Sequence, residues 1–428
     1  MLMKGIKKGI LYKRVQVIAF IAATSPFVPV SAQDKQVKDT LSVGPAGHKK
    51  DSLQLRRITQ QEDAMDIVKK VFKAKKDVKA DSANLQPGVL YPSILPALGY
   101  TVVNGGTATV GVNISFYTDS INTTNLSTIS ASPLVSLLHQ YTLPIISSVF
   151  TKNNKINFLG DWRYYKYPSF TYGLGGYTSL SDADLIDYSY IKFNQEVLYH
   201  LGHDFYAGVG YDFEYHFNMV NDGPDNASYE AYPNTNLSHT TSSGFVAHIK
   251  YDSRTNINNP REAVFGSIIY RYNTPLLGSD NEWQSVQIEL RKYFKVGKRE
   301  NVLGFWSWNE FTFGGTVPYF DLPSTGWDTY ANSGRGYIQG RYRGTSLAYL
   351  EGEYRFQITN NGLLGGVVFL NGETVPEYPS NKFETINTGE GIGLRIKMNR
   401  YSDTNLCIDY AFGNGGSQGI FFNLGEVF

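Results

Sequence analysis

The segment Gly415–Gly419 reads Gly-Gly-Ser-Gln-Gly and matches the Gly-x-Ser-x-Gly pattern that presents a nucleophilic serine in many hydrolases. That chemistry needs a turn between a strand and a helix, with an acidic residue and a histidine after the serine. Only nine residues follow Gly419, and none of them is a histidine. The segment therefore predicts a glycine-rich hairpin turn, and we identify no catalytic residue.

Metal and cofactor chemistry find equally little support. His200 and His203 stand three residues apart beside a predicted turn, without a third ligand nearby. The chain has no Walker loop, no Gly-x-Gly-x-x-Gly that opens a helix and no Cys-x-x-Cys pair. We therefore predict no metal site, no cofactor and no enzymatic activity.

The elements that carry the charged residues are predicted to be strands, because apolar and polar residues alternate over long segments. Successive strand side chains face opposite sides, so in 208–217 the odd-numbered aromatic and aliphatic residues share one face and Asp212, Glu214 and His216 share the other. The same alternation recurs at 286–291, 350–356, 392–398 and 406–412. It places Glu351, Glu353 and Asp409 on the polar face.

Composition and the amino terminus narrow the class further. The chain has 39 Lys+Arg against 38 Asp+Glu, one cysteine and 14% aromatic residues, which argues against a nucleic-acid binder and a disulfide scaffold. Residues 1–32 combine a basic start, an apolar stretch and the small-residue site Val30-Ser31-Ala32. They predict a secretory signal peptide that is cleaved near Gln33.

These features favour a transmembrane antiparallel β-barrel over residues 89–428, in the outer membrane of a Gram-negative bacterium. A soluble sandwich would show the same alternation. The export signal, the aromatic content and a terminal strand 419–428 with Phe422, Leu424 and Phe428 on one face favour the barrel, which pairs all backbone groups in lipid. The expected partners are outer-membrane lipids, and nucleic acid is not expected.

About sixteen strands are predicted, an even number as in bacterial single-chain barrels. Pro133 and Pro144 are expected to interrupt the third and fourth strands, and boundaries in 94–185 are the least defined. Asn256–Pro260 is predicted to be a short periplasmic turn, and Gly315–Arg343 a long external loop. The predicted strand starts are 94, 107, 126, 141, 155, 185, 204, 241, 262, 282, 301, 345, 362, 388, 404 and 418.

Residues 33–88 form a predicted periplasmic segment that is rich in lysine. Thr59-Gln60-Gln61-Glu62 has the spacing of a capping box, and an apolar face from Ala64 to Phe72 follows, so a helix is expected near 59–76. A solvated linker, a plug and a docking site for a partner remain open for this helix.

The long loop contains Gly334-Arg335-Gly336-Tyr337, which resembles the Arg-Gly-Phe/Tyr loop motif of the BamA/TamA superfamily of bacterial surface antigen barrels. Asp252 and Arg254, followed by Pro260 and Gly266, resemble the periplasmic turn motif of that superfamily. The segments 409–413 and 425–428 resemble its closing strands. The resemblance covers the predicted barrel and is densest over 240–428.

The resemblance implies that Arg335 pairs with an acidic residue inside the barrel and holds the loop there. The planar guanidinium suits a carboxylate, and the flanking glycines permit a tight backbone path. Glu353 is the preferred partner, with Glu351 and Asp409 as alternatives. The chain departs from the superfamily in one respect, because 33–88 is too short for a POTRA domain.

The function implied by the resemblance is insertion, assembly or translocation of outer-membrane proteins, with nascent outer-membrane proteins and periplasmic assembly factors as partners. The mechanism of the superfamily implies that the first and last strands are weakly paired, so that this seam can open and one of its edges can pair with an incoming strand. Glycines at 99, 105, 106, 415, 416 and 419 would weaken pairing there. A passive porin-like channel and a lipid-modifying barrel enzyme are the alternatives.

Overall fold

The computed structural model describes residues 61–64, 66–67, 86–101, 105–137, 139–221, 232–233, 238–297 and 299–428. The predicted signal peptide lies outside these residues, as does most of the predicted helix near 59–76. Within 61–67, the backbone N–H groups of Asp66 and Ile67 donate to the carbonyl oxygen of Asp63, which gives a single helical turn. The part of the chain that the structure describes contains no helix long and apolar enough to span a membrane.

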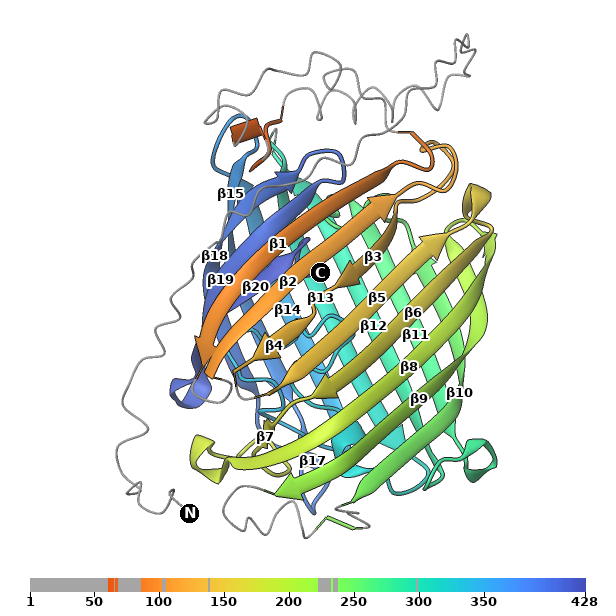
Figure 1. Cartoon of the computed structure of the whole chain (residues 1–428), viewed down its shortest axis with the longest axis vertical. Coiled ribbons are helices and arrows are strands. Elements are labelled where there is room, and N and C mark those ends of the chain that lie inside the picture. The colour runs from red at the N-terminus through yellow and green to blue at the C-terminus, as the bar shows by residue number, and fades with distance from the viewer. Residues whose placement is uncertain are drawn as a thin grey trace.

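The described chain is dominated by one antiparallel sheet of eighteen strands, which curls into a barrel-like cylinder (Figure 1). A separate hairpin, β16 (Pro376–Glu377) and β17 (Lys382–Phe383), lies in the connection between β15 and β18. The eighteen strands are β1 (Leu90–Thr101), β2 (Gly105–Phe116), β3 (Ser127–Ala131), β4 (Leu134–Ser136), β5 (Tyr141–Phe150), β6 (Ile156–Lys166), β7 (Ser169–Thr171), β8 (Asp184–Gly202), β9 (Phe205–Asn221), β10 (His239–Asp252), β11 (Ala263–Asn273), β12 (Trp283–Val296), β13 (Asn301–Phe313), β14 (Ser346–Gln357), β15 (Leu364–Thr374), β18 (Asn387–Asn399), β19 (Thr404–Gly413) and β20 (Gln418–Leu424).

The strand count differs from the predicted sixteen because two positions in the sheet are each filled by two short strands. β3 and β4 both pair with β2 and β5, and β6 and β7 both pair with β8. Pro133 separates β3 from β4, as predicted. The predicted interruption at Pro144 is wrong, because β5 is continuous there. Pro144 lies opposite the gap between β3 and β4, where an N–H donor is not needed for the ladder.

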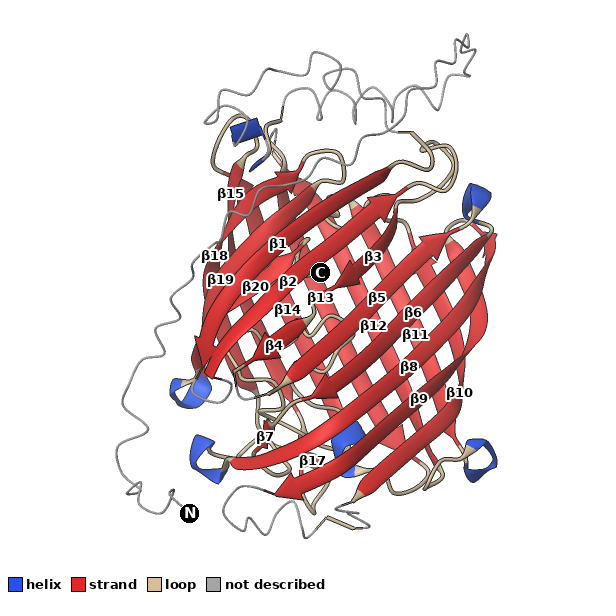
Figure 2. Ribbon diagram, viewed as in Figure 1, coloured by secondary structure: helices blue, strands red, loops and turns tan. Residues whose placement is uncertain are grey.

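The connections follow the predicted division into short turns and long loops only in part (Figure 2). The predicted short turn Asn256–Pro260 lies in a longer connection, 253–262, between β10 and β11. Tight turns join β8 to β9, β12 to β13 and β14 to β15 at one end of the cylinder. Five other described connections each contain one 3-10 turn, namely η2 (Lys152–Asn154), η3 (Leu180–Asp182), η4 (Pro275–Leu277), η5 (Tyr319–Asp321) and η6 (Asn414–Gly416). The longest described connection, 314–345 between β13 and β14, contains η5 and lies at the opposite end from the tight turns.

The cylinder carries its large apolar side chains outside and its charged side chains inside. Val209, Leu350 and Ile392 are at least 60% exposed, whereas Asp212, Glu351 and Arg395 on the opposite faces of the same strands are buried. The alternation predicted from the sequence is thus present in space. Such an inside-out distribution is expected where hydrocarbon, and not water, surrounds a barrel.

The first and last strands of the sheet are joined differently from the others. Apart from the short β7, each strand from β2 to β19 in the large sheet has ladder partners on both sides, but among the described residues no ladder pairs β1 with β20. Sparse contacts bridge this seam instead. The side-chain amide of Asn399 donates to the carbonyl of Pro92 at 3.2 Å, and a Cβ placed on Gly111 would lie 3.0 Å from Cδ1 of Leu424.

Candidate functional site

The loop 314–345 (the long loop) folds back into the cylinder. Arg335, Arg343, Tyr337 and Tyr342 are each buried to at least 95%. Arg343 binds the loop to itself, because its guanidinium donates to the carbonyls of Tyr319, Phe320 and Leu322 at 3.0–3.3 Å. The long loop is therefore a packed element of the lumen.

Arg335 lies among all three carboxylates proposed for it. Its guanidinium donates to Asp409 Oδ2 at 2.6 Å, to Glu353 Oε2 at 2.7 Å and to Glu351. The same group stacks on the ring of Phe369, 3.6 Å from the centroid. The prediction that Glu353 is the preferred partner is therefore too narrow, because Arg335 binds all three carboxylates. β14 contributes two of them and β19 the third.

The Arg335 site extends into a closed ring of alternating charges. Asp409 Oδ1 accepts from Arg395 at 2.5 Å, and Arg395 donates to Glu426 Oε2 at 2.8 Å. Glu426 lies 3.7 Å from Arg355, which pairs with Glu353, and Glu353 returns to Arg335. We call this set the charge ring; its members are Arg335, Asp409, Arg395, Glu426, Arg355 and Glu353.

Two glycines allow the loop backbone to come this close to the strands. Gly336 has φ +112°, and a Cβ there would lie 2.6 Å from the carbonyl oxygen of Phe412 in β19. A Cβ on Gly389 in β18 would lie 2.6 Å from the carbonyl oxygen of Arg335. Both positions therefore require glycine. Gly334, with φ +73°, also has the left-handed conformation that favours glycine.

Tyr337 fixes the loop to the strands that precede the seam. Its hydroxyl donates to the carbonyl of Thr388 in β18 at 2.5 Å and accepts from the N–H of Asn414 after β19 at 2.8 Å. Burial raises its pKa, so the hydroxyl remains protonated and can donate. Arg335, Gly336 and Tyr337 of the predicted loop motif thus contact β14, β15, β18 and β19.

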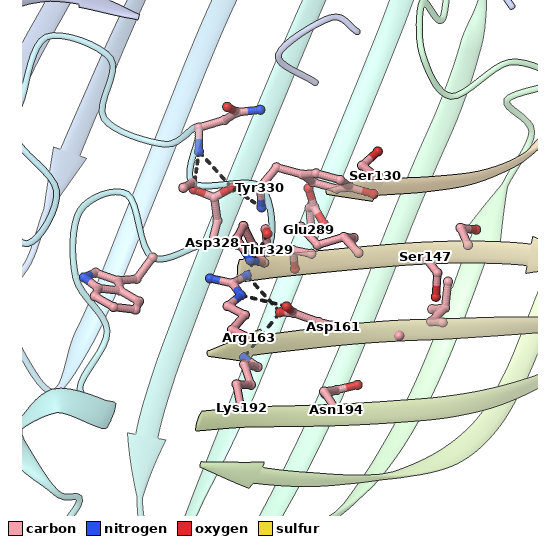
Figure 3. A pocket seen from close by; sticks show the side chains of 18 of the residues that line it. Ser130, Ser147, Asp161, Arg163, Lys192, Asn194, Glu289, Asp328, Thr329 and Tyr330 are labelled. Atoms are coloured by element: carbon pink, nitrogen blue, oxygen red, sulfur yellow. Dashed lines mark hydrogen bonds and ion pairs between the residues drawn. The ribbon is translucent and has the colours of Figure 1, made fainter. Parts of the chain in front are cut away.

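The opposite side of the lumen is less filled. Figure 3 shows Asp328, Thr329 and Tyr330 of the long loop beside Asp161, Arg163 and Lys192 of β6 and β8. Arg163 donates to the Thr329 carbonyl at 2.7 Å and pairs with Asp161. A cavity of about 600 Å³ remains beside the loop, and both charged and apolar residues line it. The lining comes from β1–β3, β5, β6 and β8–β13, and also from residues 422–427 at the end of β20 and after it.

The predicted periplasmic turn motif forms a local structure. Arg254 donates to both carboxylate oxygens of Asp252, at 2.8 and 3.0 Å, and its guanidinium lies 4.1 Å from the centroid of Phe265. The Pro260 carbonyl accepts from Arg355 of the charge ring at 3.2 Å. Gly266 lies within β11, where a Cβ would make only ordinary contact with Leu290. Packing therefore does not explain this glycine.

Sequence reasoning missed the importance of Asn258 in the same turn. Its side-chain amide donates to Ser115 Oγ of β2 at 3.0 Å and to Thr404 Oγ1 of β19 at 3.2 Å. Its carbonyl accepts from the N–H of Glu426 at 2.6 Å. Asn258 therefore joins strands on both sides of the seam. The Asn-Asn-Pro sequence marks a turn but carries no signal of these distant partners.

The expectation for the last residues is partly wrong. Phe422 is 40% exposed on the outer surface, and Leu424 ends β20 against β2. Phe428 does not share their face, because the strand ends at Leu424 and the chain turns inward at Gly425, which has φ +94°. Phe428 is 2% exposed and packs on Trp306 inside the lumen.

Glu426, Arg355 and Arg395 belong to the site but are not predicted as site residues. Alternation indicates that the two arginines face the lumen, but not which acids they meet. Burial alone would raise the pKa of Glu426, but Arg395 and Arg355 outweigh burial and lower it to about 2. Glu426 is therefore ionised at neutral pH and completes the charge ring.

Neither sequence pattern suggestive of catalysis or metal binding forms such a site. Ser417 lies between η6 and β20 in a strand-to-strand turn, not on an elbow before a helix. Among the described residues no group of three or more His, Cys, Asp or Glu side chains is arranged to hold a metal ion.

Comparisons with known proteins give structural matches only. No family model and no curated protein match the chain. Among solved structures, it is similar to BamA from Haemophilus ducreyi lacking POTRA domains 1–3, with 15% identity over 87% of this chain and 81% of that chain and a TM-score of 0.49. It is also similar to CdiB from Acinetobacter baumannii, with 12% identity over 78% of this chain and 59% of that chain and a TM-score of 0.49.

Proposed function

We propose that this chain is an outer-membrane barrel of the BamA/TamA type that takes part in the insertion, assembly or translocation of outer-membrane proteins. The observation that carries the proposal is the seam, at which β1 and β20 have no ladder between them in the described chain. Among the described residues, each of these strands has a ladder on one side only, so its other side is an edge of the sheet. An incoming strand can add to such an edge by main-chain hydrogen bonds.

The outer surface supports a membrane location for this activity. Large apolar side chains such as Ile249, Ile268 and Leu370 are at least 50% exposed on the strands, while the charges are enclosed. In water, so much exposed apolar surface would favour aggregation. In a bilayer, the same surface contacts hydrocarbon, and a nascent strand at the seam would pass directly from the barrel edge into lipid.

The long loop supports a role in more than passive permeation. The buried ion pairs of Arg335 hold it in the lumen, and the sequence around Arg335 resembles the superfamily loop motif. A loop held in this way keeps the lumen partly filled while the seam opens towards lipid. No covalent chemistry is needed for this function, because strand exchange alters only hydrogen bonds and burial.

The experiment that tests the proposal locks the seam. In a Cys407→Ser background, Gly111→Cys and Leu424→Cys place two thiols across it, because the Leu424 side chain lies against Gly111. Oxidation, or a short bis-maleimide, then joins β20 to β2. The purified barrel is placed in liposomes, and the rate at which a urea-unfolded outer-membrane protein becomes protease-resistant is measured. We expect the locked seam to slow insertion at least tenfold, with recovery on reduction of the disulfide.

The matched control joins two strands that already share a ladder. Val197→Cys and Val209→Cys, which are register partners on the outer faces of β8 and β9, should cross-link without slowing insertion. Equal insertion by the locked and unlocked seam would contradict the proposal. So would an equal loss of activity in the control.

A passive channel is the second candidate, and the cavity of about 600 Å³ is the observation in its favour. It predicts steady conductance of the purified barrel in a planar bilayer, and no acceleration of protein insertion in liposomes. High conductance with a seam that can be locked without any effect would favour this alternative.

A further inference from the structure

The last described residues, Gly425–Phe428, form a short inward segment that is bound inside the lumen. Phe428 stacks on Trp306 and Tyr293, with centroid distances of 5.4 and 6.1 Å, and its carbonyl oxygen accepts from Arg355 at 2.8 Å. In the view of Figure 1 the end of the chain lies over the middle of the cylinder, in agreement with this burial. The segment is thus held by aromatic and charged groups of the lumen wall.

The inward segment contacts the long loop directly. The side-chain amide of Asn332 in the loop donates to the Val427 carbonyl at 2.7 Å. Asn332 is itself fixed by Asp328, whose carboxylate accepts from the backbone N–H of Asn332 at 3.0 Å and of Ser333 at 2.7 Å. The middle of the long loop therefore contacts the segment that follows β20.

The charge ring provides a second connection between the same two elements. Glu426 contributes the carboxylate of the segment and Arg335 the guanidinium of the loop, and Asp409 with Arg395 lies between them. If Glu426 leaves the ring, Arg395 and Arg355 lose a carboxylate in a buried environment. The two arginines then interact more strongly with Asp409 and Glu353, and these two carboxylates are also the partners of Arg335.

The other end of the inward segment is attached to the seam. It follows β20 directly, and the N–H of Glu426 donates to the carbonyl of Asn258, whose side chain binds Ser115 in β2. Any movement of β20 away from this position pulls on Glu426. The segment therefore touches both parts of the molecule that the proposed function requires, the seam and the long loop.

We propose that the inward segment couples the seam to the long loop, so that its departure from the lumen weakens the hold of the charge ring on Arg335, and release of the loop in turn loosens the segment. Such coupling is reciprocal by thermodynamic necessity. This coupling goes beyond the proposed function. It holds whether or not the barrel inserts proteins, because it concerns only the contacts between two segments of this chain.

Hydrogen–deuterium exchange of the full barrel in lipid nanodiscs tests the coupling in both directions. Glu426→Gln removes the charge of the segment but retains its shape. We expect it to raise amide exchange at least tenfold in peptides that cover 330–340 of the loop. Arg335→Ala should raise exchange to a similar extent in peptides that cover 418–428. Effects confined to the mutated element in both variants would overturn the proposal.

The matched control is Glu196→Gln, which removes another buried lumen carboxylate. Glu196 binds His248 on the far side of the lumen and has no contact with the charge ring. We expect Glu196→Gln to leave amide exchange in 330–340 and 418–428 unchanged. If it raises exchange in both peptides as much as Glu426→Gln and Arg335→Ala do, the barrel is loosened in general and the proposal is overturned. If Glu426→Gln does not fold into a heat-modifiable barrel, Asn332→Ala takes its place. This variant removes only the contact with Val427, and an at least threefold rise in exchange over 418–428 is expected; unchanged exchange there would overturn the proposal.

Discussion

The two sides of the lumen use buried charges in different ways. On the side of β14–β20, the arginines and carboxylates bind elements that enter from elsewhere, namely the long loop and the inward segment. On the side of β6–β12, the charges pair mainly with each other on the wall, although Arg163 also donates to the Thr329 carbonyl of the long loop and His216 lies 3.4 Å from Asp321. Asp161 pairs with Arg163 and Glu289 with Arg291, each two residues away on its own strand.

The consequence of this difference is visible in the volume that each side leaves open. Where charges are shared with inserted segments, the lumen is packed, and Phe428 and Arg335 are both only 2% exposed. Beside β6–β12 a cavity of about 600 Å³ remains, which also extends past β1–β3 to residues 422–427. Similar residue types therefore fill the lumen where they bind both inserted elements, and leave space where their partners lie mainly on the wall.

The largest effect that separates the two sides is expected for Arg335→Ala. It leaves Glu351, Glu353 and Asp409 buried with fewer partners, and breaking a buried ion pair in this way costs about 3–5 kcal/mol. We expect the barrel to unfold at lower denaturant concentration, with the loop becoming sensitive to protease and conductance rising. Denaturant titration in detergent micelles, limited proteolysis and bilayer recordings measure these changes.

Arg291→Ala is the corresponding change on the open side. Arg291 pairs with Glu289 on the same strand, and among the described residues no hydrogen bond or ion pair joins it to the long loop, so the loop should remain protected from protease. If Arg291→Ala exposes the loop as strongly as Arg335→Ala does, the distinction between the two sides is wrong.

A smaller effect is expected for Gly336→Ala, which tests the close approach of the loop to β19. The new Cβ would lie 2.6 Å from the Phe412 carbonyl oxygen at a residue with φ +112°, and strain of this kind costs on the order of 1–3 kcal/mol. The loop should become more sensitive to protease while the circular dichroism of the barrel is retained.

Gly202→Ala provides the matched control for this change. Gly202 has nearly the same φ, +111°, but within the described chain no atom lies within 4 Å of the place that a Cβ would occupy. It therefore suffers the backbone strain without the clash. Equal protease sensitivity of the loop in both variants would show that contact with β19 is unimportant.

The sheet could be predicted from the sequence because its signal is local. Alternation at 208–217 or 392–398 needs only the two-residue period of a strand, and the strand starts near 141, 204 and 388 lie within a residue of those observed. Arg335 was recognised through a motif. Its three carboxylates were placed on the correct face by the same alternation.

The remaining features depend on contacts that are distant in sequence. Phe428 continues the apolar pattern of 420–424, so periodicity places it outside, and only Gly425 hints at the turn that carries it into the lumen. The partners of Asn258 are more than 140 residues away along the chain. Likewise, alternation predicts that Arg395 faces inward but cannot show that Glu426 reaches it.

The smallest effect is expected at the end of the cylinder that carries the tight turns, where residues near 61–67 contact the turns after β14 and β18. Arg400 donates to Asp66 at 3.0 Å, and Asn361 donates to Glu62 at 2.8 Å. Because the Arg400–Asp66 pair is partly exposed to solvent, Arg400→Ala should cost about 1 kcal/mol or less. Denaturant titration should therefore show little change, while a spin label attached at Gln61 becomes more mobile. If Arg400→Ala destabilises the barrel as much as Arg335→Ala does, the expected order of the two effects is wrong, and the contact at the end of the cylinder stabilises the barrel as strongly as the charge ring.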